Sequence, residues 1–456
     1  MKLNEAGITL IDCDHKTPAA QASGYPYVGI PQLKDGHIRL DGARLISEED
    51  FVLWTKKAKP QLNDVILSRR CNPGESAYVP ESLEIALGQN LVLLRSDGSV
   101  IYPPFLRWLV QGNEWWEQVN KFLNVGAVFN SLKCKDIPNF KLTIPSLKEQ
   151  REITDILSSL DKKIELNSKL NQTLESIAQA IFKSWFIDFE PVRAKIAAKQ
   201  TGQDPEFAAM CAISGKNQAE LEQMAKEDFA ELQATAALFP DELIESELGE
   251  VPKGWEVKEA SSIFNISIGK TPPRKEPYWF SNYSDDIKWL SIKDMGNNGL
   301  FTKETSEYLT HQAIAKFNIK VLPRNTVLLS FKLTVGRVVI SNSEITTNEA
   351  IAHFFSDKIP YFWTYLYLRN FDFSKLGSTS SIATAINSKI IKDMPFLVVD
   401  TMILRVFEKN VSTFFETIRN NEVQNSNLMN VRDTLLPKLL SGEVDVSALQ
   451  GEGIDG

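Results

Sequence analysis

The stretch Ser146–Trp185, SLKEQREITDILSSLDKKIELNSKLNQTLESIAQAIFKSW, repeats its apolar residues in steps of three and four. The seam starts at Ile153 and Leu157 and continues to the end of the stretch. A sustained apolar period of about 3.5 residues is typical of a coiled-coil helix rather than of a helix lying on a sheet. Ser146 followed three residues later by Glu149 predicts a capping box at the start of this helix.

The same seam recurs 254 residues later, from Phe407 to Leu439. Both copies carry two asparagines in mid-seam: Asn167, Asn171, Asn421 and Asn425. If the helices pair antiparallel, the two middles meet and the asparagines face one another, which favours one register over slipped ones. A solvated face remains the alternative for these four residues.

Short strings outside the helices are also duplicated. NSLKCKDIP at 130–138 recurs as NSKIIKDMP at 387–395, NDVILS at 63–68 as NTVLLS at 325–330, and LKD at 33–35 as IKD at 292–294. Near-constant offsets with small drift indicate duplicated domains with loop insertions. Short β-like runs broken by Gly, Pro, Asn and Asp precede each helix, so each half begins with a mixed globular domain.

The expected fold class is α+β, with two mixed α/β domains in tandem, an antiparallel coiled coil of two long helices, and pseudo-two-fold symmetry. The expected segments are a first globular domain at 1–144, a first long helix at 145–190, an acidic connector of one or two short helices at 191–249, a second globular domain at 250–400, a second long helix at 401–442 and a tail at 443–456.

Composition limits the function classes. The net charge of −8 argues against a nucleic-acid partner, but residues 200–249 alone hold eleven acids and two lysines, whereas 250–409 holds 20 basic and 16 acidic residues. No apolar run reaches the roughly 18 residues of a membrane span, and the N-terminus does not resemble a secretory signal, so the cytoplasm is expected. The four cysteines and four histidines are scattered, which argues against a structural metal site.

Two motifs that suggest chemistry fail on inspection. GKT at 269–271 matches the end of a phosphate-binding loop, but Phe264 stands where that loop needs glycine, and two prolines follow where a helix should donate N–H groups. YPPF at 102–105 resembles the loop of amino-methyltransferases, yet tyrosine lacks the required acceptor. We therefore expect no catalytic residue and no metal ligand.

What survives is binding chemistry. KTP occurs at 16–18 and again at 270–272, at the same offset of 254 as the helices. A lysine, a hydroxyl and a rigid proline in equivalent loops suit contacts with DNA phosphates, and arginines beside the ILS and LLS runs could reach base edges. An ordinary solvated charge remains the alternative for each residue alone. The candidate DNA-binding residues are Lys16, Thr17, Lys34, Arg69, Arg70, Lys270, Thr271, Arg274, Lys293, Lys332, Arg337, Ser378, Thr379 and Ser380.

Four strings carry a resemblance to a known family: IPSLKEQREITDIL at 144–157, AIFKSWFIDFEPV at 180–192, SELGEVPKGWEV at 246–257 and TLLPKLLSGEVDV at 434–446. With the duplication, the chain resembles the specificity (S) subunit of type I restriction–modification enzymes over essentially its whole length. The first half departs from the pattern, because nothing in it corresponds to LGEVPKGWEV.

The resemblance implies that each globular domain is a target-recognition domain reading one part of a split sequence in double-stranded DNA. It further implies that the helices set the spacing and dock two methyltransferase (M) subunits, which nuclease/translocase (R) subunits then join. Adenosylmethionine, ATP and magnesium would belong to those partners, so no cofactor is expected in this subunit. An orphan or decoy subunit, and a coiled-coil scaffold without DNA reading, are the alternatives.

Overall fold

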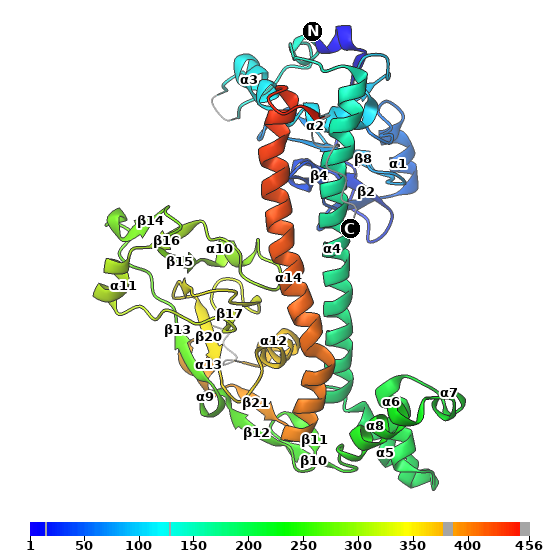
Figure 1. The fold of residues 1–456 in the computed structure, drawn as a ribbon, viewed down its shortest axis with the longest axis vertical. Helices are drawn as coiled ribbons and strands as arrows, with labels where there is room; N and C mark the ends of the chain where they lie inside the picture. Colours follow the sequence, from blue (N-terminus) through cyan, green and yellow to red (C-terminus); the bar gives the residue numbers. More distant parts are fainter. Residues whose placement is uncertain (14–15, 127–128, 377–385, 447–456) are drawn as a thin grey trace. The chain divides into compact units, whose positions relative to one another are not determined.

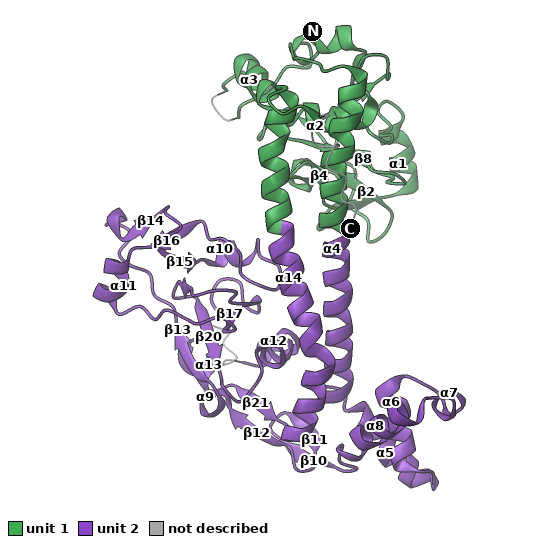
Figure 2. Cartoon of the chain, in the orientation of Figure 1, with its two compact units in different colours: residues 1–165, 426–456 green, residues 166–425 purple. Residues whose placement is uncertain are grey.

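The computed structural model of the chain describes residues 1–13, 16–126, 129–376 and 386–446 (Figure 1). The chain divides into two compact units, residues 1–165 with 426–456 and residues 166–425 (Figure 2). Both units therefore contain a part of each long helix, α4 (Leu147–Phe186) and α14 (Thr401–Leu440).

The first unit is built on an antiparallel four-stranded sheet in the order β1-β9-β6-β7. A second sheet has the order β5-β2-β8, in which β2 and β8 are parallel. The strands are β1 (Ile8–Asp12), β2 (Tyr25–Val28), β3 (Leu33–Lys34), β4 (His37–Ile38), β5 (Arg44–Ile46), β6 (Val65–Ser68), β7 (Ser76–Tyr78), β8 (Ala86–Leu87) and β9 (Leu91–Ser96). The helices are η1 (Leu3–Ala6), η2 (Ile30–Gln32), α1 (Glu48–Thr55), η3 (Pro103–Phe105), α2 (Leu106–Leu109), α3 (Asn113–Phe122) and η4 (Ile137–Asn139).

The second unit repeats this plan. Its antiparallel sheet has the order β13-β20-β17-β18, and a second sheet has the order β14-β16-β15-β19 with β15 and β19 parallel. The strands are β10 (Leu243–Ser246), β11 (Gly249–Pro252), β12 (Glu256–Glu259), β13 (Asn265–Ile268), β14 (Phe280–Ser281), β15 (Ile287–Leu290), β16 (Glu307–Leu309), β17 (Val327–Ser330), β18 (Val338–Ile340), β19 (Thr346–Thr347), β20 (Ile351–Phe355) and β21 (Pro395–Val398). The helices are α9 (Ala260–Ile263), η5 (Pro277–Trp279), α10 (Ile292–Met295), α11 (His311–Phe317), α12 (Tyr361–Asn370), η6 (Phe373–Lys375) and α13 (Ser388–Asp393).

The two long helices run antiparallel. In the second unit Asn167 pairs with Asn425 and Asn171 with Asn421, so residue numbers rise along α4 while they fall along α14. Each helix also gives apolar side chains to the core of each unit; in the second unit Phe182 of α4 and Phe407 of α14 lie 5.9 Å apart between ring centroids. The expected capping box is confirmed, because the Glu149 amide donates to Ser146 Oγ and the Ser146 amide to Glu149 Oε2.

The connector differs from the expectation of one or two short helices. It folds as four helices with a small core of Ala209, Met210, Leu221 and Ala236. Lys195 is buried and donates to Glu206 and to the carbonyl of Phe239, a pairing that offsets the cost of burying its charge. The helices are α5 (Glu190–Thr201), α6 (Pro205–Ser214), α7 (Gln218–Glu222) and α8 (Lys226–Ala237).

Candidate nucleic-acid interface

Three loops meet at one end of the four-stranded sheet in the second unit: the loop after β13, the turn before β20 and the tip of the β17–β18 hairpin. The amide of Gly269 donates to Ile351, and that of Phe331 donates to Ala350. Lys270 extends this network by donating its amide to Thr347. These backbone bonds fix the loops to one another.

The first unit joins the equivalent loops by equivalent bonds. The amide of Arg69, the counterpart of Phe331, donates to Asn90 at 2.9 Å. Gln89 Nε2 donates to Thr17 Oγ1 at 3.1 Å. The counterpart bond in the second unit runs from Thr271 Oγ1 to Glu349. The duplication therefore extends to individual hydrogen bonds.

The two KTP threonines thus play the same structural part. Thr17 holds the loop after β1 to the turn before β9, and Thr271 holds the loop after β13 to the turn before β20. Lys270 Nζ donates to the carbonyls of Phe317 and Asn318 at the end of α11, where a cation is favourable. Lys16 is exposed, and its carbonyl accepts hydrogen bonds from Tyr27 and Trp54. Phosphate contact by these lysines and threonines stays a prediction.

Glu349 is the centre of a charged cluster in the second unit. Burial by itself raises the pKa of this carboxyl, but the Thr271 hydroxyl, the backbone amide of Glu349 itself and the charges of Lys332 and Arg274 together bring it below its ordinary value. Arg274 also forms a two-pronged ion pair with Glu307, at 2.6 and 2.9 Å. The structure therefore brings Thr271, Arg274 and Lys332 together.

Arg337 contacts α10, the short helix that carries Lys293. Arg337 Nη1 donates to the carbonyl of Ile292 in α10 at 3.1 Å, and Lys293 is the next residue of that short helix. Both side chains are exposed. Exposed basic side chains on adjoining loops can contact the phosphates of one DNA segment.

In the first unit Arg69 is half-buried and lies 3.7 Å from Asp12, whereas Arg70 and Lys34 are exposed. Arg70 belongs to the β6–β7 hairpin and Lys34 to β3, which pairs with β4. Ser378, Thr379 and Ser380 lie outside the described residues.

The mid-seam asparagines bond across the helix pair in the second unit. Asn167 Nδ2 donates to Asn425 Oδ1 at 2.9 Å and to Gln424 Oε1 at 2.7 Å. Asn421 Nδ2 donates to Asn171 Oδ1 at 2.8 Å. Asn167 and Asn425 are only 2% and 6% exposed, so these two do not lie on a solvated face.

Buried charges tie each globular part to the helices of its own unit. In the first unit Asp161 of α4 is paired with Arg107 of the globular part and with Arg432 of α14. Burial alone would raise the pKa of Asp161, but the bonds from His37 and both arginines hold it far below its usual range.

In the second unit the ties come from α14. Arg419 donates to Asn325 at 2.5 Å and to Asn342 at 3.0 Å. Glu422 accepts the amides of Leu300 and Phe301, and burial nevertheless raises its pKa above the ordinary value. These bonds tie the segments just before β17 and just after β18, together with the backbone at Leu300 and Phe301, to α14 within the unit.

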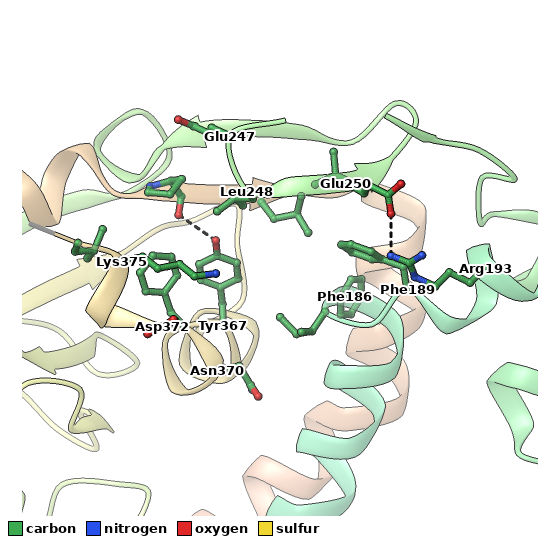
Figure 3. A pocket seen from close by; sticks show the side chains of 16 residues that line it. Phe186, Phe189, Arg193, Glu247, Leu248, Glu250, Tyr367, Asn370, Asp372 and Lys375 are labelled. Atoms are coloured by element: carbon green, nitrogen blue, oxygen red, sulfur yellow. Dashed lines mark hydrogen bonds and ion pairs between the residues drawn. The ribbon is translucent and has the colours of Figure 1, made fainter. Parts of the chain in front are cut away.

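The second unit also contains a groove of about 470 Å³ where α4 ends (Figure 3). Phe186 and Phe189 form one wall, Leu248 of the β10–β11 hairpin another, and Tyr367 of α12 a third. An ion pair of 3.2 Å between Arg193 and Glu250 borders it. Two of the strings that carried the resemblance, at 180–192 and 246–257, therefore line one groove.

Sequence reasoning missed several of these residues. Glu349, Arg419 and Asp161 act through partners distant in sequence, so no local signal marked them. Leu333, at the tip of the β17–β18 hairpin, could have been noticed in the sequence, because it closely follows the LLS run and stands between the basic residues Lys332 and Arg337.

Among the described residues, no group of three His, Cys, Asp or Glu side chains could hold a metal ion. Within the same ranges, none of the helices has the length and hydropathy needed to cross a membrane.

Comparison with known proteins agrees with this architecture. The family described as the type I restriction modification DNA specificity domain matches residues 12–176 and 252–425. The HindI specificity subunit of Haemophilus influenzae is 33% identical over 83% of this chain and 86% of its own length. The MjaIX specificity subunit of Methanocaldococcus jannaschii is 28% identical over 90% and 83%.

Among solved structures, the S subunit of a type I restriction–modification system from M. genitalium aligns with 96% of this chain and 95% of its own. Its sequence identity is 14% and the TM-score is 0.48. The family match covers both repeats, and the HindI relative extends across most of the chain. The chain thus belongs to the family of type I restriction–modification specificity subunits.

Proposed function

We propose that each globular part of this chain reads one half of a two-part sequence in double-stranded DNA. The observation that carries the proposal is the duplicated loop arrangement, with Arg70 exposed at one hairpin tip and Lys332 at the other. A two-stranded β-ribbon fits the major groove, where the base edges are distinguishable. Exposed basic residues beside it would supply phosphate contacts that fix the register.

The helix pair would set the gap between the two half-sites. Its polar pairs, Asn167 with Asn425 and Asn171 with Asn421, support a single register. A helix pair held in one register keeps a constant distance along its axis, at about 1.5 Å per residue. We infer that this distance translates into a constant number of base pairs.

The chain would act without catalysis of its own. Two methyltransferase subunits would bring adenosylmethionine, and nuclease/translocase subunits would bring ATP and magnesium. The relatives' names as specificity subunits support this division of labour. The cytoplasm, where DNA and those partners meet, is the proposed location.

The groove at the end of α4 is the proposed contact for a methyltransferase subunit. Its walls carry exposed apolar side chains, Ile187 at 38% and Leu248 at 36%, which a partner can cover. We expect Leu248→Glu to weaken co-purification with the methyltransferase at least tenfold. Ile244→Glu is the matched control, because Ile244 is 43% exposed on the same hairpin but does not line the groove. Equal capture of both variants would contradict this contact.

The decisive test is co-expression with the methyltransferase subunit followed by mapping of methylated adenines. The proposal expects a split motif that disappears when this chain is deleted. An unchanged methylation map would sink it and favour the coiled-coil scaffold. Methylation that is still unaccompanied by restriction when the nuclease/translocase subunit is also co-expressed would identify an orphan or decoy subunit. We further expect the lone chain to bind DNA weakly and with little sequence preference, which titration at fixed salt would measure.

A further inference from the structure

The tip of the β17–β18 hairpin holds an apolar side chain in full view of solvent. Leu333 is 96% exposed, the highest value among the exposed large hydrophobic residues of the described chain. Single exposed leucines are common on protein surfaces and by themselves indicate nothing. Three further properties of this position distinguish it.

Its backbone is held in a conformation that leucine avoids. Leu333 has φ +62°, in the left-handed region where glycine or asparagine is favoured. The equivalent residue of the first unit, Cys71, also has φ +62° and is exposed. The turn geometry is therefore a feature of both repeats, but only the second repeat places a large apolar side chain on it.

The base of the hairpin is closed by several hydrogen bonds. Ser330 Oγ accepts the amide of Arg337 at 3.1 Å and donates to the carbonyl of Thr334. The amide of Gly336 donates to the carbonyl of Ser330 at 3.0 Å. Leu333 is thus presented on a preorganised support, which lowers the entropy lost when it contacts a ligand.

Its surroundings are basic and polar. Lys332 and Thr334 flank it in sequence, and both are exposed. Arg337 directly precedes β18, the second strand of the same hairpin. An apolar tip surrounded by cations suits a polyanion that also presents apolar groups. In the major groove of DNA, the only exposed methyl group on a base edge is the C5-methyl of thymine.

On the proposed function, we propose that Leu333 contacts the C5-methyl group of one thymine in the half-site read by the second unit. The contact would discriminate thymine from the other bases at that position. Insertion of Leu333 between base pairs from the minor groove is the competing arrangement, since apolar wedges are used there. The width of a two-stranded hairpin favours the major groove.

The test uses this chain in complex with its methyltransferase, on duplexes carrying the mapped motif. Each thymine of both half-sites is replaced in turn by deoxyuridine, which lacks only the methyl group. At one thymine, the unaltered complex should bind the deoxyuridine duplex about fourfold more weakly, the factor for burying one methyl group. The Leu333→Ala complex should bind both duplexes equally, and Leu333→Met should restore the discrimination.

Val335→Ala is the matched control on the same hairpin, at 41% exposure, and should retain the thymine preference. A Leu333→Ala complex with the same thymine-to-deoxyuridine ratio as the unaltered complex overturns the inference. So does a result in which deoxyuridine weakens binding at none of the thymines of either half-site. A 2-aminopurine signal of unstacking that Leu333→Ala abolishes would instead identify the minor-groove wedge. In each of these outcomes the split motif persists, so the proposed function stands; loss of the motif itself would count against that function.

Discussion

Gly269-Lys270-Thr271 illustrates how a short match to a nucleotide loop arises from packing. A Cβ on Gly269 would lie 2.1 Å from the carbonyl oxygen of Asn348, so only glycine fits there. Lys270 caps α11 and Thr271 holds Glu349. All three residue types are accounted for by contacts within the second unit.

Thr271 is expected to act mainly through stability. Thr271→Val removes the hydroxyl that donates to the Glu349 carboxylate, and should lower the free energy of unfolding by about 1 kcal/mol at this partly exposed site. Thr271→Ser keeps the donor and should behave like the unaltered chain. Urea unfolding provides the measurement. Unchanged stability with weaker DNA binding would instead support the phosphate role.

His353 is expected to make the second unit less stable in acid. Its ring nitrogens are bonded to Ser267 at 2.9 Å and Thr347 at 2.7 Å in the buried sheet. Burial, with a smaller contribution from Lys320, lowers the pKa of His353 from 6.5 to about 3. The unfolded chain takes up this proton below about pH 6.5 while the folded chain does not, so acid favours unfolding.

We therefore expect His353 to contribute a loss of stability of up to about 1.4 kcal/mol per pH unit between pH 6.5 and 3. His353→Leu should flatten the dependence of the unfolding free energy on pH by this amount. His311→Gln, at an exposed site that leaves His353 intact, is the control. Parallel pH profiles for His353→Leu and the unaltered chain would refute the assignment.

At the scale of elements, the helix pair and the sheets were foreseen to different extents. The period of the seam and the repeat offset predicted both long helices, because each helix encodes its apolar face locally. The runs DVILS and TVLLS became β6 and β17. The sheet order was not predictable, since β1 pairs with β9 across a long stretch of intervening chain.

The central asparagines are expected to matter more for register than for total stability. Asn167→Ala leaves the buried Asn425 carbonyl without this donor and should lower the free energy of unfolding by about 1–3 kcal/mol. The double variant Asn167→Leu with Asn425→Leu should recover that loss while loosening the register. Denaturant unfolding tests the first statement. Faster hydrogen exchange near Asn171 in the double variant tests the second, and protection as in the unaltered chain would disprove it.

At the scale of the molecule, the charge distribution separates a potential DNA surface from an acidic insertion. The family match leaves residues 177–251 uncovered, and this interval holds 14 acidic and six basic residues, a net charge of −8. The repeats that the match does cover hold the exposed basic residues. The whole-chain charge of −8 therefore understates how basic the two matched repeats are.

Because each unit has its own loops, contributions from Arg70 and Lys332 should be independent. In the complex with methyltransferase, Arg70→Ala and Lys332→Ala should each reduce the slope of log affinity against log salt by about 1, and the double variant by about 2. Lys216→Ala, in the acidic connector, should leave the slope unchanged. Binding titrations over a salt series provide the test, and a double variant no different from either single one would argue against two separate contacts.

The sequence alone determined the duplication, the α+β class, the two long helices and the family, because these depend on periodicity and on comparing the chain with itself. Only the tertiary structure decided which basic side chains are already engaged and which are exposed. Arg274 is occupied by Glu307, and Lys270 by the end of α11, whereas Lys332 and Leu333 project from a hairpin tip. The physical reason is that ion pairs and strained turns depend on partners brought together across the fold, which residue spacing does not encode.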